Sequence, residues 1–154
     1  MRKILLALDA AKGSDVCVKA CARMFAAASP RSVILLHVLQ LGGGPTLMHD
    51  RMSDTEIETL KEELGRSDAL QKLHSQARAL LDSHRKKLQR LGIRATKLIV
   101  KTGHVAEQIL DTAKGEGAEL IIIGNNRGAV AKLLMGDVVK AVVSGAEMPV
   151  LLVR

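Results

Sequence analysis

The stretch from Glu119 to Val138 holds the residues best suited to binding an anion. An apolar run, Leu120 to Ile123, leads into Gly124 and then into polar and glycine residues that tolerate tight or left-handed backbone conformations. Gly136 and Asp137 come next, followed by valines and alanines at helical spacing. A strand, glycine-rich loop and helix in this order direct backbone N–H groups toward one point, which suits a phosphate. The stretch is therefore the first candidate for a ligand site.

The cysteine and histidine side chains give weaker indications of a functional site. Cys17 and Cys21 lie four residues apart in a predicted helix, and we favour packing on the core over a redox pair or half a metal site. No third cysteine exists to complete a zinc site, so we expect no metal centre. For His84 we favour a place in the core or at its rim over a ligand role. His104 follows the third strand at a helix start and could touch a ligand, but we favour a helix-cap or solvent role.

The sequence also lacks the signatures of nucleotide-cleaving enzymes. It contains no GxxxxGK[ST] phosphate loop, no SGGxDS-type pyrophosphatase motif after the first strand, and no paired carboxylates at the glycine-rich loop. We therefore do not expect an enzyme, although weak ATP hydrolysis stays open.

The net charge of +7 is concentrated in residues 66–101. This segment has two acidic residues and ten basic ones, for a local charge of +8: Arg66, Lys72, Arg78, Arg85, Lys86, Lys87, Arg90, Arg94, Lys97 and Lys101. A basic face suits nucleic acid, but no known nucleic-acid-binding motif is present and Phe25 is the only aromatic residue. We favour a solvated helix surface, or one that faces an acidic neighbour, and expect neither nucleic acid nor a membrane as partner.

Apolar runs and turn residues alternate along the whole chain. We predict strands over 4–8, 33–38, 97–101, 120–123 and 148–153, and helices over 15–28, 53–64, 68–91, 104–114 and from the glycine-rich loop to about 146. The 53–64 helix begins with a capping box, Ser53 followed three residues later by Glu56. One domain over residues 1–154, with an insertion at about 40–66, accounts for the length.

Five apolar strands that alternate with helices predict an α/β fold, a parallel sheet with helices on both faces. Ligands of such sheets bind beyond the carboxyl ends of the strands, where the strand order reverses. Asp9 and Gly124 each follow a strand and are expected to flank that point. The last strand is expected at an edge, and because apolar edges invite pairing we predict a homodimer through Val150–Val153. No apolar run approaches the roughly 20 residues of a membrane span, and no signal peptide is evident, so we expect a cytoplasmic protein.

Several segments together resemble the universal stress protein family. They are ILLALD, VILLHV, TGHVAEQILDTAKGEGAELIIIG, LLMGDVVKAVV and MPVLLVR, and they cover nearly the whole chain apart from the 40–66 insertion. The resemblance implies a five-stranded sheet of order 3-2-1-4-5 (adenine nucleotide alpha hydrolase-like), dimerisation through the last strand, and a role in stress survival.

Nucleotide-binding members of the family carry the motif G-x2-G-x9-G-[ST] after the fourth strand. By resemblance, Asp9 contacts the adenosine end of the nucleotide, Val38 forms an apolar wall, and Gly124 and Gly136 supply backbone contacts. Arg127 holds the place of the second glycine, with Gly128 one position late, and the loop is one residue short. Asp137 replaces the final Ser or Thr and precedes Val138.

Asp137 should weaken phosphate binding. As an N-cap, its carboxylate would occupy the N–H groups that a phosphate needs and would also repel the phosphate. At 4 Å in a surface-like dielectric, two unit charges interact by about 4 kcal/mol before screening. The first hypothesis is therefore a dimeric regulator that acts by contacts with unidentified proteins and has a degenerate or absent ATP site. The alternative is an ATP- or AMP-binding switch in which the nucleotide orders the 125–135 loop.

Overall fold

The computed structural model describes residues 2–10, 13–40, 53–64, 68–125 and 136–154. Five strands form one parallel sheet in the order β3-β2-β1-β4-β5: β1 Lys3–Ala7, β2 Ser32–Leu39, β3 Thr96–Thr102, β4 Leu120–Gly124 and β5 Val150–Val153. The helices are α1 Gly13–Phe25, α3 Asp54–Leu64, α4 Asp68–Arg90, α5 Val105–Glu116 and α6 Asp137–Gly145. The fold class and strand order predicted above are confirmed, and β5 lies at an edge.

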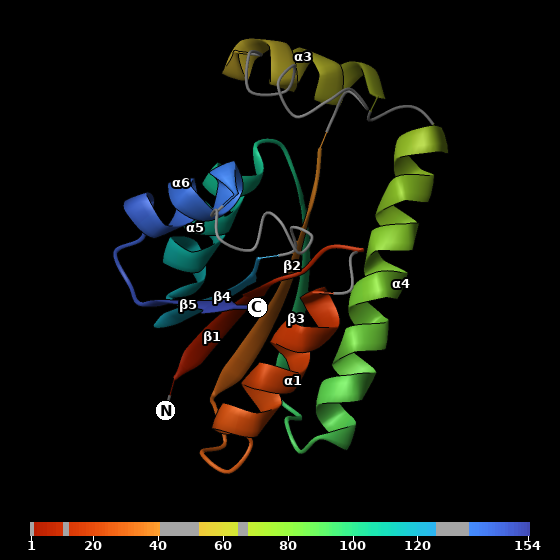
Figure 1. The fold of residues 1–154 in the computed structure, drawn as a ribbon. Coiled ribbons are helices and arrows are strands. Elements are labelled where there is room, and N and C mark those ends of the chain that lie inside the picture. The colour runs from red at the N-terminus through yellow and green to blue at the C-terminus, as the bar shows by residue number, and fades with distance from the viewer. Residues whose placement is uncertain (1, 11–12, 41–52, 65–67, 126–135) are drawn as a thin grey trace.

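The helices cover both faces of the sheet because the strands are apolar on both sides (Figure 1). Ile4 and Leu6 of β1 belong to the core cluster under α1 and α4, whereas Leu5 between them belongs to the cluster under α5 and α6. Successive side chains of a strand point to opposite faces, so one strand contributes to both clusters. This explains why the strands read as continuous apolar runs.

Several predicted boundaries were wrong by a few residues. Helix α1 begins at Gly13 and ends at Phe25, rather than running over 15–28. Helix α5 runs through Gly115 to Glu116, and Gly117 ends it in a left-handed conformation with φ 66°. Strand β5 begins at Val150 rather than Met148, since Pro149 has no N–H to donate and joins the sheet through its carbonyl alone.

About half of the predicted 40–66 insertion lies outside the described residues. Its described part is α3, which lies beyond the carboxyl ends of the strands (Figure 1). The capping box forms as predicted: the Ser53 N–H donates to Glu56 Oε2 at 2.8 Å, and the Glu56 N–H donates to Ser53 Oγ at 3.2 Å. No described helix is long and apolar enough to cross a membrane.

Part of the basic 66–101 segment faces acidic residues. Lys87 donates to Asp15 of α1, and Lys97 of β3 donates to Glu116 of α5. Within α4, Asp82 pairs with Arg85 and Lys86. These ion pairs place Lys87 and Lys97 opposite acidic residues of α1 and α5, while the predicted absence of a nucleic-acid partner stays a prediction.

His84 lies buried between α4 and α1, only 4% exposed, as expected. Its Nδ1 is 3.6 Å from Asp15 Oδ1, whose closer partner is Lys87. The pKa of His84 is lowered, first by burial and then by repulsion from Lys87, which together outweigh the attraction of Asp15 and Asp9. The folded protein therefore holds His84 neutral at neutral pH.

This burial predicts a loss of stability in mild acid. Unfolded His84 takes up its proton near its ordinary pKa of about 6.5, and the folded protein takes it up only at lower pH. The unfolded state therefore binds more protons below about pH 6.5, and the free energy of unfolding should fall between pH 7 and pH 5. The pKa of Asp15 is lowered by its hydrogen bond to Lys87, so that pair weakens only near and below its ordinary value of 3.8.

Urea unfolding followed by circular dichroism at pH 7.0 and 5.5 tests this. The loss of stability on acidification should be smaller for His84→Gln than for the wild type. His74→Gln, on the same helix, should keep the wild-type dependence. Equal losses in the wild type and His84→Gln would show that His84 does not set the response.

Candidate functional site

A cavity of about 440 Å³ opens at the carboxyl ends of β1, β2 and β4. From β1 the sheet grows in one direction through β2 and β3 and in the other through β4 and β5, and the cavity lies at this reversal point, as expected for a parallel sheet. Its volume falls in the range of small-molecule sites, about 300–1,000 Å³. Of the predicted site residues, Asp9, Val38, Gly124 and Val138 line it together.

Asp9 is held in place by Ser14, a buried residue in the first turn of α1. The Asp9 N–H donates to Ser14 Oγ at 2.8 Å. The Ser14 hydroxyl lies 2.9 Å from the Asp9 carbonyl oxygen and 3.0 Å from Asp9 Oδ1, and it donates to these acceptors. The contacts fix the Asp9 backbone and one carboxylate oxygen, which orients the acidic side chain at the cavity wall.

His37 positions the neighbouring wall of the cavity. Its Nδ1 lies 2.7 Å from the carbonyl oxygen of Leu8. Because a carbonyl only accepts, Nδ1 must carry the proton. The ring thus ties β2 to the residue that precedes Asp9.

Gly124 lies so close to α1 that a side chain there would crowd its neighbours. A Cβ there would lie 3.2 Å from the Sγ of Cys17 and 3.4 Å from the carbonyl oxygen of Gly13. Burial raises the pKa of the Cys17 thiol to about 11, with a smaller contribution from Asp9. Cys17 is therefore a protonated, apolar part of the wall rather than a nucleophile.

Both cysteines are free and buried, in agreement with the predicted packing role. Burial raises the pKa of Cys21 to about 12. Its thiol is also protonated at neutral pH, which favours packing over redox chemistry.

The start of α6 differs from the predicted capping arrangement. Gly136 is the N-cap, with φ −65° and ψ 158°, and Asp137 is the first helical residue. The Asp137 side chain is exposed, and no described hydrogen bond joins it to the N–H groups at this helix end. The prediction that Asp137 caps the helix and occupies these donors was wrong, but its charge still lies beside Val138 of the cavity wall.

Two predicted site residues, Arg127 and Gly128, lie outside the described residues, as does most of the 125–135 loop. The sequence interpretation missed other lining residues: Ser14, Cys17, His37, Gln40, Val105 and Ile109. The sequence could have pointed to two of them. Ser14 follows a glycine at a helix start, and His37 is the single polar residue in the apolar run 33–38. Each is now explained by its contact next to Asp9.

Comparisons with known proteins agree with this geometry. A model of the universal stress protein family matches residues 1–154. A universal stress protein of Thermus aquaticus is 34% identical over 154 residues, with 99% of this chain and 98% of that protein covered. Universal stress protein MJ0577 of Methanocaldococcus jannaschii is 26% identical over 160 residues, with 99% and 94% covered.

The solved structure of MJ0577 has a TM-score of 0.74 to this chain, at 25% identity, with 99% of this chain and 94% of that one covered. Two more distant structures share the fold. One is a universal stress protein in complex with cAMP, with 15% identity, a TM-score of 0.67, and 99% and 97% coverage. The other is an Archaeoglobus fulgidus member in complex with dAMP, with 18% identity, a TM-score of 0.58, and 100% and 98% coverage. The sheet and helices have the adenine nucleotide alpha hydrolase-like fold of these structures, and the chain belongs to the universal stress protein family.

Proposed function

We propose that the cavity binds an adenine nucleoside monophosphate, and that the protein acts as a nucleotide-responsive regulator rather than as an ATP-dependent enzyme. The observation that carries the proposal is the cavity itself. It combines a fixed carboxylate, Asp9, with an apolar wall at the reversal point of the sheet.

Each part of such a ligand has a matching surface. The Asp9 carboxylate can accept hydrogen bonds from the two ribose hydroxyls. Val38, Ile109 and Val139 provide an apolar wall for a flat purine. The N–H groups in the first turn of α6, where no described side chain caps the helix, face the phosphate end of such a ligand in this proposal. The cAMP and dAMP complexes of family members support this class of ligand.

The outer phosphates of ATP meet a less favourable surface. Asp137 places a carboxylate at the helix N-terminus where family members that bind ATP have Ser or Thr. The loop is also one residue shorter than their motif. Like charges near this helix end repel, so we infer that the second and third phosphates add little affinity.

Asp137→Ser should raise the affinity for ATP about tenfold and the affinity for AMP by less, because AMP brings fewer negative charges to this end of α6. The exposed position of Asp137 allows solvent to screen most of the roughly 4 kcal/mol of bare repulsion, so about a tenfold effect, or about 1.4 kcal/mol, remains. Isothermal titration calorimetry at fixed ionic strength measures both affinities. Glu119→Gln removes a charge at the other end of β4 and should change neither. Equal ATP affinity in the wild type and Asp137→Ser would refute the electrostatic argument.

We further propose that the regulator is a homodimer joined through β5, which acts by contacts with protein partners. Strand β5 pairs only with β4 among the described strands, and all four of its residues are half-buried in the single chain. An apolar edge of this kind favours pairing with a second copy.

A spectrum of the purified protein gives a first test of the ligand class. The chain has no tryptophan and no tyrosine, so a retained nucleotide would dominate the absorbance near 260 nm. Titration of adenosine, AMP and ATP into nucleotide-free protein then ranks the ligands. The proposal requires AMP to bind at one site per chain, and failure of all three to bind up to millimolar concentration would overturn it.

A further inference from the structure

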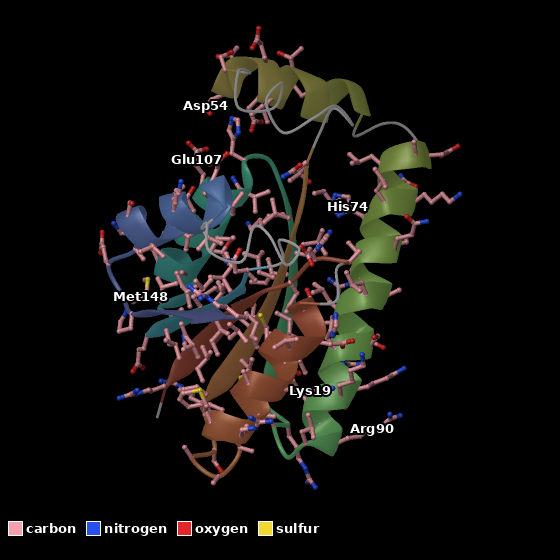
Figure 2. The ribbon with its side chains drawn as sticks, viewed as in Figure 1. Lys19, Asp54, His74, Arg90, Glu107 and Met148 are labelled. Atoms are coloured by element: carbon pink, nitrogen blue, oxygen red, sulfur yellow. The ribbon has the colours of Figure 1, made fainter. Side chains whose placement is uncertain are left out.

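A second cluster of ligating groups lies outside the nucleotide cavity. Asp54, His104 and Glu107 each bring one nitrogen or oxygen donor to a common point, and these atoms lie within 4.8 Å of one another. Figure 2 shows Asp54 on α3 and Glu107 on α5 at facing ends of the two helices. Residues about 50 positions apart in the chain thus meet at one place.

Local structure places each of the three side chains. Asp54 is the first residue of α3, and the reciprocal Ser53–Glu56 hydrogen bonds fix the helix start beside it. His104 is the N-cap of α5, in an extended conformation, and Glu107 lies in the first turn of the same helix. Residues three apart on a helix share a face, so His104 and Glu107 form a preset pair.

The charges in this cluster favour a cation. Asp54 and Glu107 bring two carboxylates to within a few ångströms of each other, and no described lysine or arginine forms an ion pair with either. One imidazole and two carboxylates form a ligand set that suits Zn²⁺, with bonds of about 2.0–2.2 Å. Donors around such an ion lie about 3.4 Å apart, so these atoms, which lie within 4.8 Å of one another, would move closer together on binding.

We propose that Asp54, His104 and Glu107 form a binding site for a divalent transition-metal ion of the Zn²⁺ type, which fastens α3 to the start of α5. Among the side chains of α3 that the structure describes, Ile57 alone is buried. The metal would supply a second attachment at the amino end of this helix. Val105, next to His104, lines the nucleotide cavity, so the ion would brace α3 beside the cavity mouth.

Co²⁺ serves as the optical probe, because tetrahedral coordination gives it visible absorption bands. Titration of Co²⁺ into the nucleotide-free protein, followed by displacement with Zn²⁺, should show one ion per chain. The loss of even an outer partner of a metal ligand typically weakens binding about 10–100-fold. Asp54→Asn, His104→Ala and Glu107→Gln should therefore each weaken binding at least tenfold.

Two matched controls separate this site from ordinary surface binding. Asp111→Asn removes the next carboxylate along α5, and His74→Ala removes a histidine of α4 that lies away from the cluster (Figure 2). Both should bind Co²⁺ as the wild type does. No binding below millimolar Co²⁺ would overturn the proposal, and so would wild-type affinity in Asp54→Asn.

Hydrogen exchange gives a readout of the fastening itself. With Zn²⁺ bound, the backbone amides of α3 should exchange at least tenfold more slowly, and this protection should disappear in Asp54→Asn. Exchange that is the same with and without Zn²⁺ would contradict the bracing role. Because the titration uses metal without nucleotide, its outcome is independent of whether AMP binds the cavity.

Discussion

Replacing Val38 with tryptophan should lower the affinity of the protein for AMP at least a hundredfold. Val38 lies near the carboxyl end of β2 and forms part of the cavity wall, where a bulky indole would fill the space proposed for the purine. Because Val38 is only half-buried, the larger side chain should not prevent folding. Calorimetric titration of AMP measures the loss, and thermal unfolding confirms that the variant folds.

Val38→Ile is the matched control, since it adds one methyl group and should keep AMP affinity within a few fold. Asp9→Asn tests the carboxylate of the cavity lining. This variant retains an oxygen for Ser14 but loses the negative charge. Hydrogen bonds to charged groups contribute about 1.5–3 kcal/mol, so we expect the affinity for AMP to fall roughly 10–150-fold. Unchanged AMP binding in Val38→Trp would place the nucleotide elsewhere.

Replacing Leu152 with proline should convert the proposed homodimer to a monomer. The carbonyls of Pro149 and Val153 accept hydrogen bonds from the N–H groups of Ile121 on β4 and of Asn125, which follows β4. Backbone groups of alternate residues point to opposite sides of a strand, so the N–H of Leu152 faces the open edge. Proline removes that donor and leaves the pairing with β4 intact.

The effect should be large because a symmetric interface loses the contact twice. Each lost hydrogen bond leaves an acceptor on the partner strand unsatisfied, which costs about 1–3 kcal/mol. The dissociation constant of the dimer should therefore rise roughly a hundredfold or more. Leu152→Ala also shortens the side chain but keeps the N–H, and it should remain mostly dimeric. Light scattering coupled to size-exclusion chromatography measures the mass. A monomeric wild type, or equal masses for the two variants, would contradict the proposed interface.

The fold could be predicted from the sequence because its strands are recognisable as uninterrupted apolar runs. Leu120 to Ile123 contains no polar residue, and such a short apolar run between glycines is typical of a strand buried on both faces. The ends of the helices and strands were harder to predict. Whether Gly115 or Gly117 ends α5 depends on which of them adopts a left-handed conformation, and the sequence offers both.

The cavity was partly predictable for a geometric reason. The carboxyl ends of neighbouring parallel strands meet at one edge, so Asp9, Val38 and Gly124 had to lie near each other once the strands were recognised. The hydrogen bonds of Ser14 to Asp9 depend on how the chain turns between β1 and α1. The N-cap position of Gly136, rather than Asp137, depends on where α6 begins, which propensity does not decide.

The metal cluster could not be foreseen from the cysteines and histidines alone, and the sequence interpretation expected no metal centre. His104 and Glu107 have helical spacing, but the third ligand comes from α3. Its position depends on long-range packing of the insertion against the start of α5. Such a contact leaves no periodic signal in the sequence.

The comparison of AMP with ATP tests the account most directly. Both affinities are measured by calorimetry on the same nucleotide-free protein at one ionic strength. We predict one AMP per chain and an ATP dissociation constant within about threefold of that for AMP, because Asp137 offsets what the outer phosphates gain at the α6 terminus. ATP binding ten or more times tighter than AMP would contradict the account.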